Sequence, residues 1–264
     1  MLEDQRGVLY PSRLPRFDRV PPKPRVAHAV RWFWIPEWNL PTGVESRQEV
    51  LPFPACNLVI DADGIELVGP QTRRSERVLT GSGWAVGALL LPAATLALAE
   101  KPSLLRDATH PVADPALHAE VVAAMADPAR PADERRADAV ARFADWVTTR
   151  VPPTQLGDEA ELANRLGVLL DDPEITRVDQ LPERLHASVR TLQRTADRAF
   201  GLSLSGMIRR RRLQEAAARL REQPEVSIAQ LASELGYSDH AHFSTDFKAV
   251  LGVTPSDYRL HASR

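Results

Sequence analysis

Two kinds of apolar pattern divide this chain. Over residues 27–91, short β-rich runs such as AVRWFWI, IELV and WAVGALLL alternate with Gly, Pro and Asp-Gly, as is typical of antiparallel strands. The segment ADG at 62–64 lies between LVI and IELV, and Asp and Gly tolerate the positive φ of a tight turn. We therefore expect a small antiparallel sheet or β-barrel, with a hairpin at 62–64.

After Pro92 the apolar positions recur at helical spacing instead. The segments expected to be helical are 93–100, 115–126, 132–149 and 158–170. The third carries an apolar stripe widened by Trp146 and made of Val140, Phe143, Ala144 and Val147. We expect this stripe to pack within its own domain rather than to form a dimer contact.

Composition breaks suggest the domain limits. Residues 1–26 are rich in proline and charge and are expected to form an extended arm. The acidic, proline-containing stretch DDPEITR at 171–177 is the expected boundary between two domains. The first, residues 27–172, is β-rich over 27–91 and helical over 92–172. The second, residues 173–264, is all-α, so the predicted fold class is α+β.

The last 90 residues contain a weak internal duplication. SVRTLQRTADRAFG at 188–201 aligns with DHAHFSTDFKAVLG at 239–252. Each copy opens with a residue that can cap a helix N-terminus, Ser188 or Asp239, and closes with a glycine suited to the left-handed C-terminal stop. A shorter helix is expected before each copy, at 179–185 and 228–235, the latter with a capping box from Ser227 and Gln230. The pattern predicts two helix-turn-helix units.

Helical spacing separates an inner from an outer face in both long helices. The residues expected in the core are Leu192, Ala196 and Phe200 in the first helix and Phe243, Phe247, Val250 and Leu251 in the second. The outer face of the first carries Arg190, Gln193 and Arg194, and Arg and Gln can read guanine and adenine in the major groove. Between the units, SGMIRRRRLQEAAARLRE at 205–222 predicts a linker helix that holds both in successive major grooves. Of its four arginines, some are expected to face phosphate and at least one to form an internal ion pair.

Charge and composition narrow the function classes. The net charge is −2, yet residues 173–264 hold 14 Lys and Arg against 11 Asp and Glu, which favours a polyanionic partner. Asp239, His240, His242 and Asp246 resemble a metal site. With Asp239 as the helix cap, however, only His242 and Asp246 of the other three share a helix face, and two ligands do not make a closed zinc site. Apolar runs are too short and interrupted for a membrane span, and a single cysteine fits a reducing cytoplasm. No metal, cofactor or membrane is expected.

The C-terminal motifs resemble those of the AraC/XylS family of bacterial transcription regulators. The matching segments are SVRTLQR, RRLQEAAARL, VSIAQLASELGYSDHAHFSTDFKAVLG and GVTPSDYR. The resemblance implies base contacts from Arg190, Gln193, Arg194, His240, Ala241, Ser244 and Thr245. Contacts with the DNA backbone are expected from Thr191, Arg209, Arg210, His242 and Lys248. The resemblance also implies a cytoplasmic regulator that is not an enzyme. Its expected partners are promoter DNA and RNA polymerase, and a homodimer is a further expectation.

Three positions depart from the family pattern. Thr245 stands where an arginine is frequent, so the first long helix is expected to carry most of the sequence specificity. Pro182 removes a backbone donor from the first short helix, and His186 stands where a turn glycine is usual.

The N-terminal domain resembles the family's effector and dimerisation domains only loosely. Its aromatic residues either line an apolar effector pocket or fill an ordinary core: Trp32, Trp34, Trp38, Phe53 and Trp84. Two alternatives stay open. In the first, the regulator responds to a protein partner without a small-molecule ligand. In the second, the N-terminal domain acts as a DNA-repair alkyl acceptor through Cys56, which requires an activated thiol.

Overall fold

The computed structural model describes residues 16–50, 54–72, 74–99 and 101–262, and its N-terminal part is built on an antiparallel sheet. Six strands lie in the order β1-β2-β7-β4-β5-β8. Their bounds are Arg16–Val20 (β1), Val30–Asn39 (β2), Asn57–Asp61 (β4), Ile65–Val68 (β5), Ser82–Leu90 (β7) and Thr109–Pro111 (β8). Within the described residues β1 and β8 are the two edges and do not pair, so the expected small sheet is confirmed as an open sheet and not as a closed barrel.

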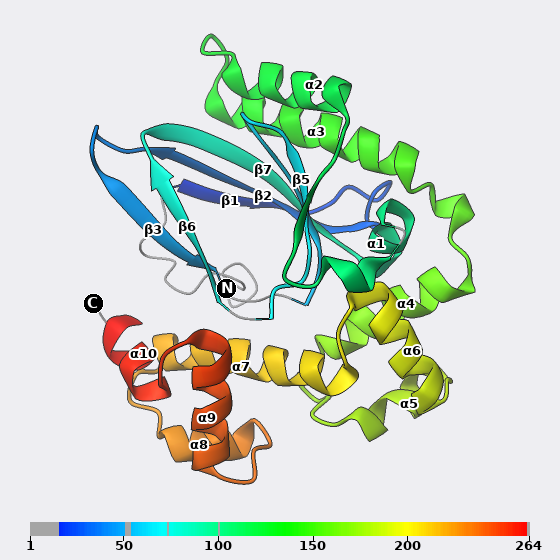
Figure 1. Cartoon of the computed structure of the whole chain (residues 1–264), viewed down its shortest axis with the longest axis vertical. Helices are drawn as coiled ribbons and strands as arrows, with labels where there is room; N and C mark the ends of the chain where they lie inside the picture. The colour runs from blue at the N-terminus through cyan, green and yellow to red at the C-terminus, as the bar shows by residue number, and fades with distance from the viewer. Residues whose placement is uncertain (1–15, 51–53, 73, 100, 263–264) are drawn as a thin grey trace.

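Two further strands, β3 (Glu45–Val50) and β6 (Ser75–Thr80), pair with each other as a separate ribbon beside the sheet (Figure 1). The expected hairpin joins β4 to β5. Its turn is held by Asp61, whose Oδ1 accepts hydrogen bonds from the backbone N–H groups of Asp63 at 2.9 Å and Gly64 at 3.1 Å. The turn is therefore an Asx turn, and neither Asp63 nor Gly64 adopts the positive φ on which the hairpin was predicted.

The predicted arm requires a correction. Its residues 1–15 lie outside the described part of the chain, but residues 16–20 form edge strand β1, which pairs with β2 from Arg16↔Glu37 to Val20↔Phe33. The apolar pattern of RFDRV is too weak to predict a strand, because the pairing partner that stabilises it is supplied from another part of the chain.

The helices that follow the sheet lie close to the predicted positions. They are α1 (Pro92–Leu98), α2 (Pro115–Ala126), α3 (Ala132–Arg150) and α4 (Asp158–Leu170), with short 3₁₀ turns η3 (Pro102–Leu105) and η4 (Pro153–Gln155) between them. Helices α2 and α3 cover one face of the sheet (Figure 1). The stripe on α3 is buried against strand residues such as Phe33 and Leu58, so its packing within its own domain is confirmed.

The tryptophans of β2 and β7 lie on opposite faces of the sheet. Trp84 lies across from Glu37 and packs against the core under the helices. Trp34 and Trp38 lie across from Gly87 and Gly83 on the other face. Side chains alternate between the two faces of a strand, so these tryptophans do not line one common pocket.

The indole rings on the open face fill the space above the glycines of β7. A Cβ at Gly87 would lie 2.0 Å from the ring of Trp34, and one at Gly83 would lie 2.3 Å from the ring of Trp38. Trp32 has the Arg31 guanidinium carbon 4.7 Å from the centre of its ring. Phe53 lies outside the described residues. The expected aromatic effector pocket is thus divided between two faces of the sheet.

The C-terminal part is helical throughout. It contains η5 (Val178–Gln180), α5 (Leu181–Leu185), α6 (Val189–Phe200), α7 (Leu204–Glu222), α8 (Ile228–Glu234), α9 (His240–Leu251) and α10 (Pro255–Ala262). Helix α7 runs between two small cores, one built on α5 and α6 and the other on α8, α9 and α10 (Figure 1). The first core also takes in Ala163, Leu166 and Leu170 of α4, which precedes the predicted domain boundary at 172.

Candidate nucleic-acid interface

Helices α5 and α6 form the first helix-turn-helix unit. His186 ends α5 with φ 52°, so the turn takes the left-handed conformation without the usual glycine. Pro182 lies in the first turn of α5, where a missing N–H group leaves no intrahelical bond unmade. Ser188 caps α6 by accepting a hydrogen bond from Thr191 N at 3.1 Å, and Gly201 ends it with φ 63°.

The two faces of α6 are those predicted. Leu192, Ala196 and Phe200 are buried in the core with α4 and α5. Arg190, Gln193 and Arg194 are exposed, at spacings of three and four residues, and therefore share one side of the helix. Thr191 is half-buried, and its hydroxyl lies 2.9 Å from that of Ser188. An exposed row of Arg, Gln and Arg supplies hydrogen-bond donors that match base edges and phosphates.

Helices α8 and α9 form the second unit. Asp239 caps α9 by accepting a hydrogen bond from His242 N at 2.7 Å, and Gly252 ends it with φ 78°. The predicted capping box on α8 is only half formed. Ser227 accepts from Gln230 N at 3.5 Å, but the Gln230 side chain donates to Glu234 rather than to the cap.

The exposed side of α9 offers fewer free donors than that of α6. Phe243 and Phe247 are fully buried, and His240, Ala241, Thr245 and Lys248 are exposed while Ser244 is half-buried. The Thr245 hydroxyl donates to the carbonyl of Ala241 at 2.9 Å, and the Ser244 hydroxyl lies 3.3 Å from Nε2 of His240. His242 leans edge-on against the ring of Tyr237, with 5.3 Å between ring centres, and its Nε2 lies 3.8 Å from Asp246.

The four arginines of α7 have four different environments. Arg211 forms the expected internal ion pair, at 2.9 Å from Glu215, and also donates to the carbonyl of Ile175 at 3.0 Å. Arg212 has its guanidinium carbon 3.8 Å from the centre of the Tyr237 ring.

Of the two arginines expected at phosphate, Arg209 is exposed and lies 3.4 Å from Asp246, which also accepts from the Tyr237 hydroxyl at 3.4 Å. These bonds tie α7 to α9. Arg210 is 7% exposed and faces the N-terminal part of the chain. The repeat of four arginines gave no signal that would have separated these environments.

The structure also bears on the thiol, metal-site and membrane interpretations. Burial raises the pKa of the Cys56 thiol to about 11, so the thiol lacks the activation that an alkyl acceptor needs. Among the described residues no three His, Cys, Asp or Glu side chains gather in a way that suits a metal ion. None of the helices in the described part of the chain is long and apolar enough to span a membrane.

Sequence comparisons match the two parts of the chain separately. A family described as "Helix-turn-helix domain" matches residues 181–261, and a "Domain of unknown function (DUF6597)" matches residues 18–111, which span β1 to β8. The HTH-type transcriptional activator RhaS of Escherichia coli (strain SE11) is 34% identical over 106 residues, which are 39% of this chain and 38% of that protein. The chain therefore matches well under half the length of this curated relative.

Similarity to solved structures is weaker, with TM-scores below 0.5 for the two described here. The C-terminal domain of AraT, a response regulator from Geobacillus stearothermophilus, is 25% identical with a TM-score of 0.34 over 40% of this chain and 88% of that one. ToxT from Vibrio cholerae O395 is 15% identical with a TM-score of 0.41 over 94% of this chain and 96% of that one. The family assignment comes from the sequence matches. Residues 181–261 of this chain belong to the AraC-type family of helix-turn-helix domains.

Proposed function

We propose that this protein is a sequence-specific DNA-binding regulator of transcription. The observation that carries the proposal is the pair of similarly capped helices, α6 and α9, each set on its own small core and each presenting a polar outer face. Helix α7 has 19 residues, so it is about 28 Å long at 1.5 Å per residue. That length suits two helices entering successive major grooves about 34 Å apart.

The contacts proposed for each helix follow from its exposed side chains. On α6, Arg190, Gln193 and Arg194 contact bases. On α9, the contacts come from His240, Ala241, Ser244 and Thr245. The DNA backbone is met by Thr191, Arg209, His242 and Lys248. Helix α6 carries most of the specificity, because Ser244 and Thr245 already have hydrogen-bond partners within α9.

The part of the proposal that goes beyond DNA binding rests on similarity to a transcriptional activator. On that basis the proposal extends to activation in the cytoplasm through RNA polymerase, to a homodimer, and to control by a small-molecule effector. It does not include an enzymatic reaction.

Fluorescence anisotropy with a labelled fragment of the promoter beside the protein's own gene tests the proposal. We expect specific, salt-sensitive binding that weakens about tenfold or more in Arg194→Ala, because one bidentate base contact is worth about 1–3 kcal/mol. Arg198→Ala is the matched control, since Arg198 lies one turn further along α6 and pairs with Glu159 of α4 at 2.9 Å. Absence of specific binding at every salt concentration, or an equal loss in both variants, contradicts the proposal.

A further inference from the structure

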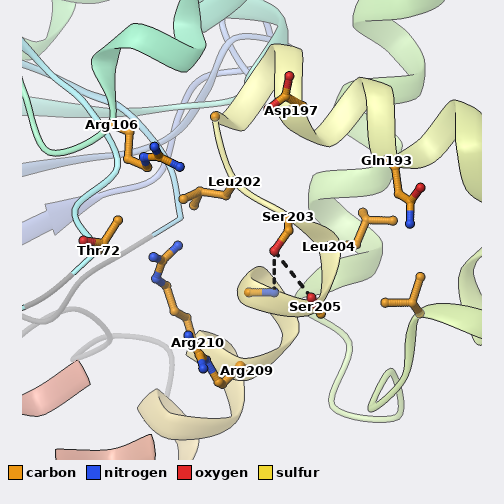
Figure 2. A pocket seen from close by; sticks show the side chains of 13 residues that line it. Thr72, Arg106, Gln193, Asp197, Leu202, Ser203, Leu204, Ser205, Arg209 and Arg210 are labelled. Atoms are coloured by element: carbon orange, nitrogen blue, oxygen red, sulfur yellow. Dashed lines mark hydrogen bonds between the residues drawn. The ribbon is translucent and has the colours of Figure 1, made fainter. Parts of the chain in front are cut away.

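A cavity of about 490 Å³ lies where the sheet part of the chain meets the helix-turn-helix part. Thr72 and Arg106 line it from the sheet side. The other walls come from α6, from the 201–203 turn and from the first turns of α7, which include Arg209 and Arg210. Figure 2 shows the side chains of Arg106 and Arg210 reaching into this space from the two sides. The volume is within the range of roughly 300–1,000 Å³ that is usual for small-molecule sites.

The environment of Arg210 is the main observation that favours a ligand in this cavity. Its side chain is more than nine-tenths buried, and its Nη1 has no hydrogen-bond partner among the described residues. Burial lowers the pKa of Arg210, and the positive charges of Arg209 and Arg106 add to that effect while Asp107 opposes it. A buried guanidinium with an unpartnered N–H group is unfavourable, and an anion in the cavity would offset that cost.

The start of α7 supplies further donors to the same cavity. Ser203 and Ser205 lie at the helix N-terminus with their hydroxyl oxygens 3.4 Å apart, and Ser203 Oγ accepts from Gly206 N at 3.2 Å (Figure 2). The N-terminal end of a helix favours negative charge because its first N–H groups are unpaired. Asp197 is the one carboxylate among the described lining residues, so cationic and neutral donors dominate the walls.

The wall on the sheet side is held in a strained conformation. Asp107, which follows Arg106, has φ 57°, and its carboxylate accepts from Thr72 N at 2.5 Å and from Thr72 Oγ1 at 2.7 Å. The two segments approach closely at Gly69, where a Cβ would lie 1.7 Å from the carbonyl oxygen of Leu105. Strained backbone of this kind is concentrated at functional sites, and here it fixes the cavity wall that carries Thr72 and Arg106.

We infer that this cavity binds a small polar molecule through its carboxylate or phosphate group, with Arg106 and Arg210 on either side of the oxyanion. Anion binding by the protein alone does not depend on the proposed function. The effect of the anion on DNA binding does rest on it, because Gln193 both lines the cavity and belongs to the face of α6 proposed to read DNA. A ligand that contacts both parts of the chain changes DNA affinity only as far as it favours one arrangement of them.

Isothermal titration of the full chain with orthophosphate and with citrate tests the inference, at constant ionic strength made up with sodium chloride. We expect saturable binding of at least one of the two probes. Arg210→Met and Arg106→Met should each weaken it about tenfold or more, since a charge-assisted hydrogen bond is lost. The control is Arg142→Met, on α3 and away from the lining residues, which should bind like the parent.

Arg106 is exposed, so its variant decides the question even if Arg210→Met fails to fold. Absence of saturation with both probes, or an equal weakening by Arg142→Met, overturns the inference. It is also overturned if Arg210→Met leaves anion binding intact but weakens DNA binding in the absence of added anion, because Arg210 would then serve the DNA backbone. Absence of specific DNA binding by the unsubstituted protein, together with normal anion binding, would instead refute the proposed function.

Discussion

At the scale of single residues, Asp114 holds together two helices that cover the sheet. Its Oδ1 accepts from Leu117 N at 3.1 Å and caps α2, while its Oδ2 accepts from Trp146 Nε1 at 2.7 Å and Arg150 Nη2 at 2.8 Å on α3. The Trp146 hydrogen bond, followed by that from Leu117, holds the pKa of Asp114 below its ordinary value. The folded protein thus favours the ionised carboxylate.

Replacing Asp114 should therefore have a pH-dependent effect. Asp114→Ala is expected to lower the free energy of unfolding by about 1–3 kcal/mol at pH 7, through loss of the cap and of the bonds to α3. Asp114→Asn keeps an acceptor for Leu117 and should lose less. The charge contributes above the unfolded pKa of about 4 and is lost as pH falls through the lower folded pKa. Urea unfolding should show the difference between parent and Asp114→Asn shrinking below about pH 4, and a constant difference would contradict this account.

At the scale of elements, helix ends were predictable because their signals are local. Ser188 and Gly201 mark the ends of α6, and Asp239 and Gly252 those of α9, within a few residues of the bonds they make. The same periodicity placed Arg190, Gln193 and Arg194 on the outer face of α6, and their role as base contacts came from the family resemblance. Strand β1 was missed because it depends on pairing with β2.

Two features of the site depend on contacts that sequence spacing does not report. The aromatic residues expected around one pocket do not share a face, because strand alternation puts Trp84 and Trp34 on opposite faces. The burial of Arg210 was also hidden, because Thr72 and Arg106 approach it from another part of the chain.

Helix α7 fixes the separation of the two helix-turn-helix units, which leads to a prediction about DNA. Its ends are tied to both cores, and Asp246 of α9 bonds Arg209 in its second turn. A rigid connection requires both half-sites on one face of the duplex, about one turn apart. Inserting 5 bp between them should abolish two-site binding, and 10 bp should do the same, because α7 is about 28 Å long. Anisotropy titrations on the three DNAs measure this, and near-normal affinity with 10 bp inserted would show that the units move independently.

At the scale of the whole molecule, the two parts of the chain meet at both helix-turn-helix units. Beside the first unit, a Cβ at Gly201 would lie 3.0 Å from Cα of Ser103 in η3. At the second, Arg74 N donates to the carbonyl of Val250 at 3.1 Å. The predicted boundary at 172 runs through this arrangement, because Leu166 and Leu170 of α4 precede it and yet pack in the core of the first unit.

Helix α4 should therefore be needed by the helix-turn-helix part, and two fragments measure its contribution. A fragment of residues 158–264 retains Ala163, Leu166 and Leu170, whereas one of residues 173–264 lacks them; both lack α1, so the comparison isolates α4. Burial of two leucines and an alanine is worth about 3–6 kcal/mol, and the shorter fragment should be less stable by that amount. Urea unfolding followed by circular dichroism measures the difference. Equal urea midpoints for the two fragments would place the boundary at 172. The expected loss of stability in the shorter fragment would instead place α4 with the DNA-binding unit. Because α4 also packs against α1, its position then couples the two parts of the chain.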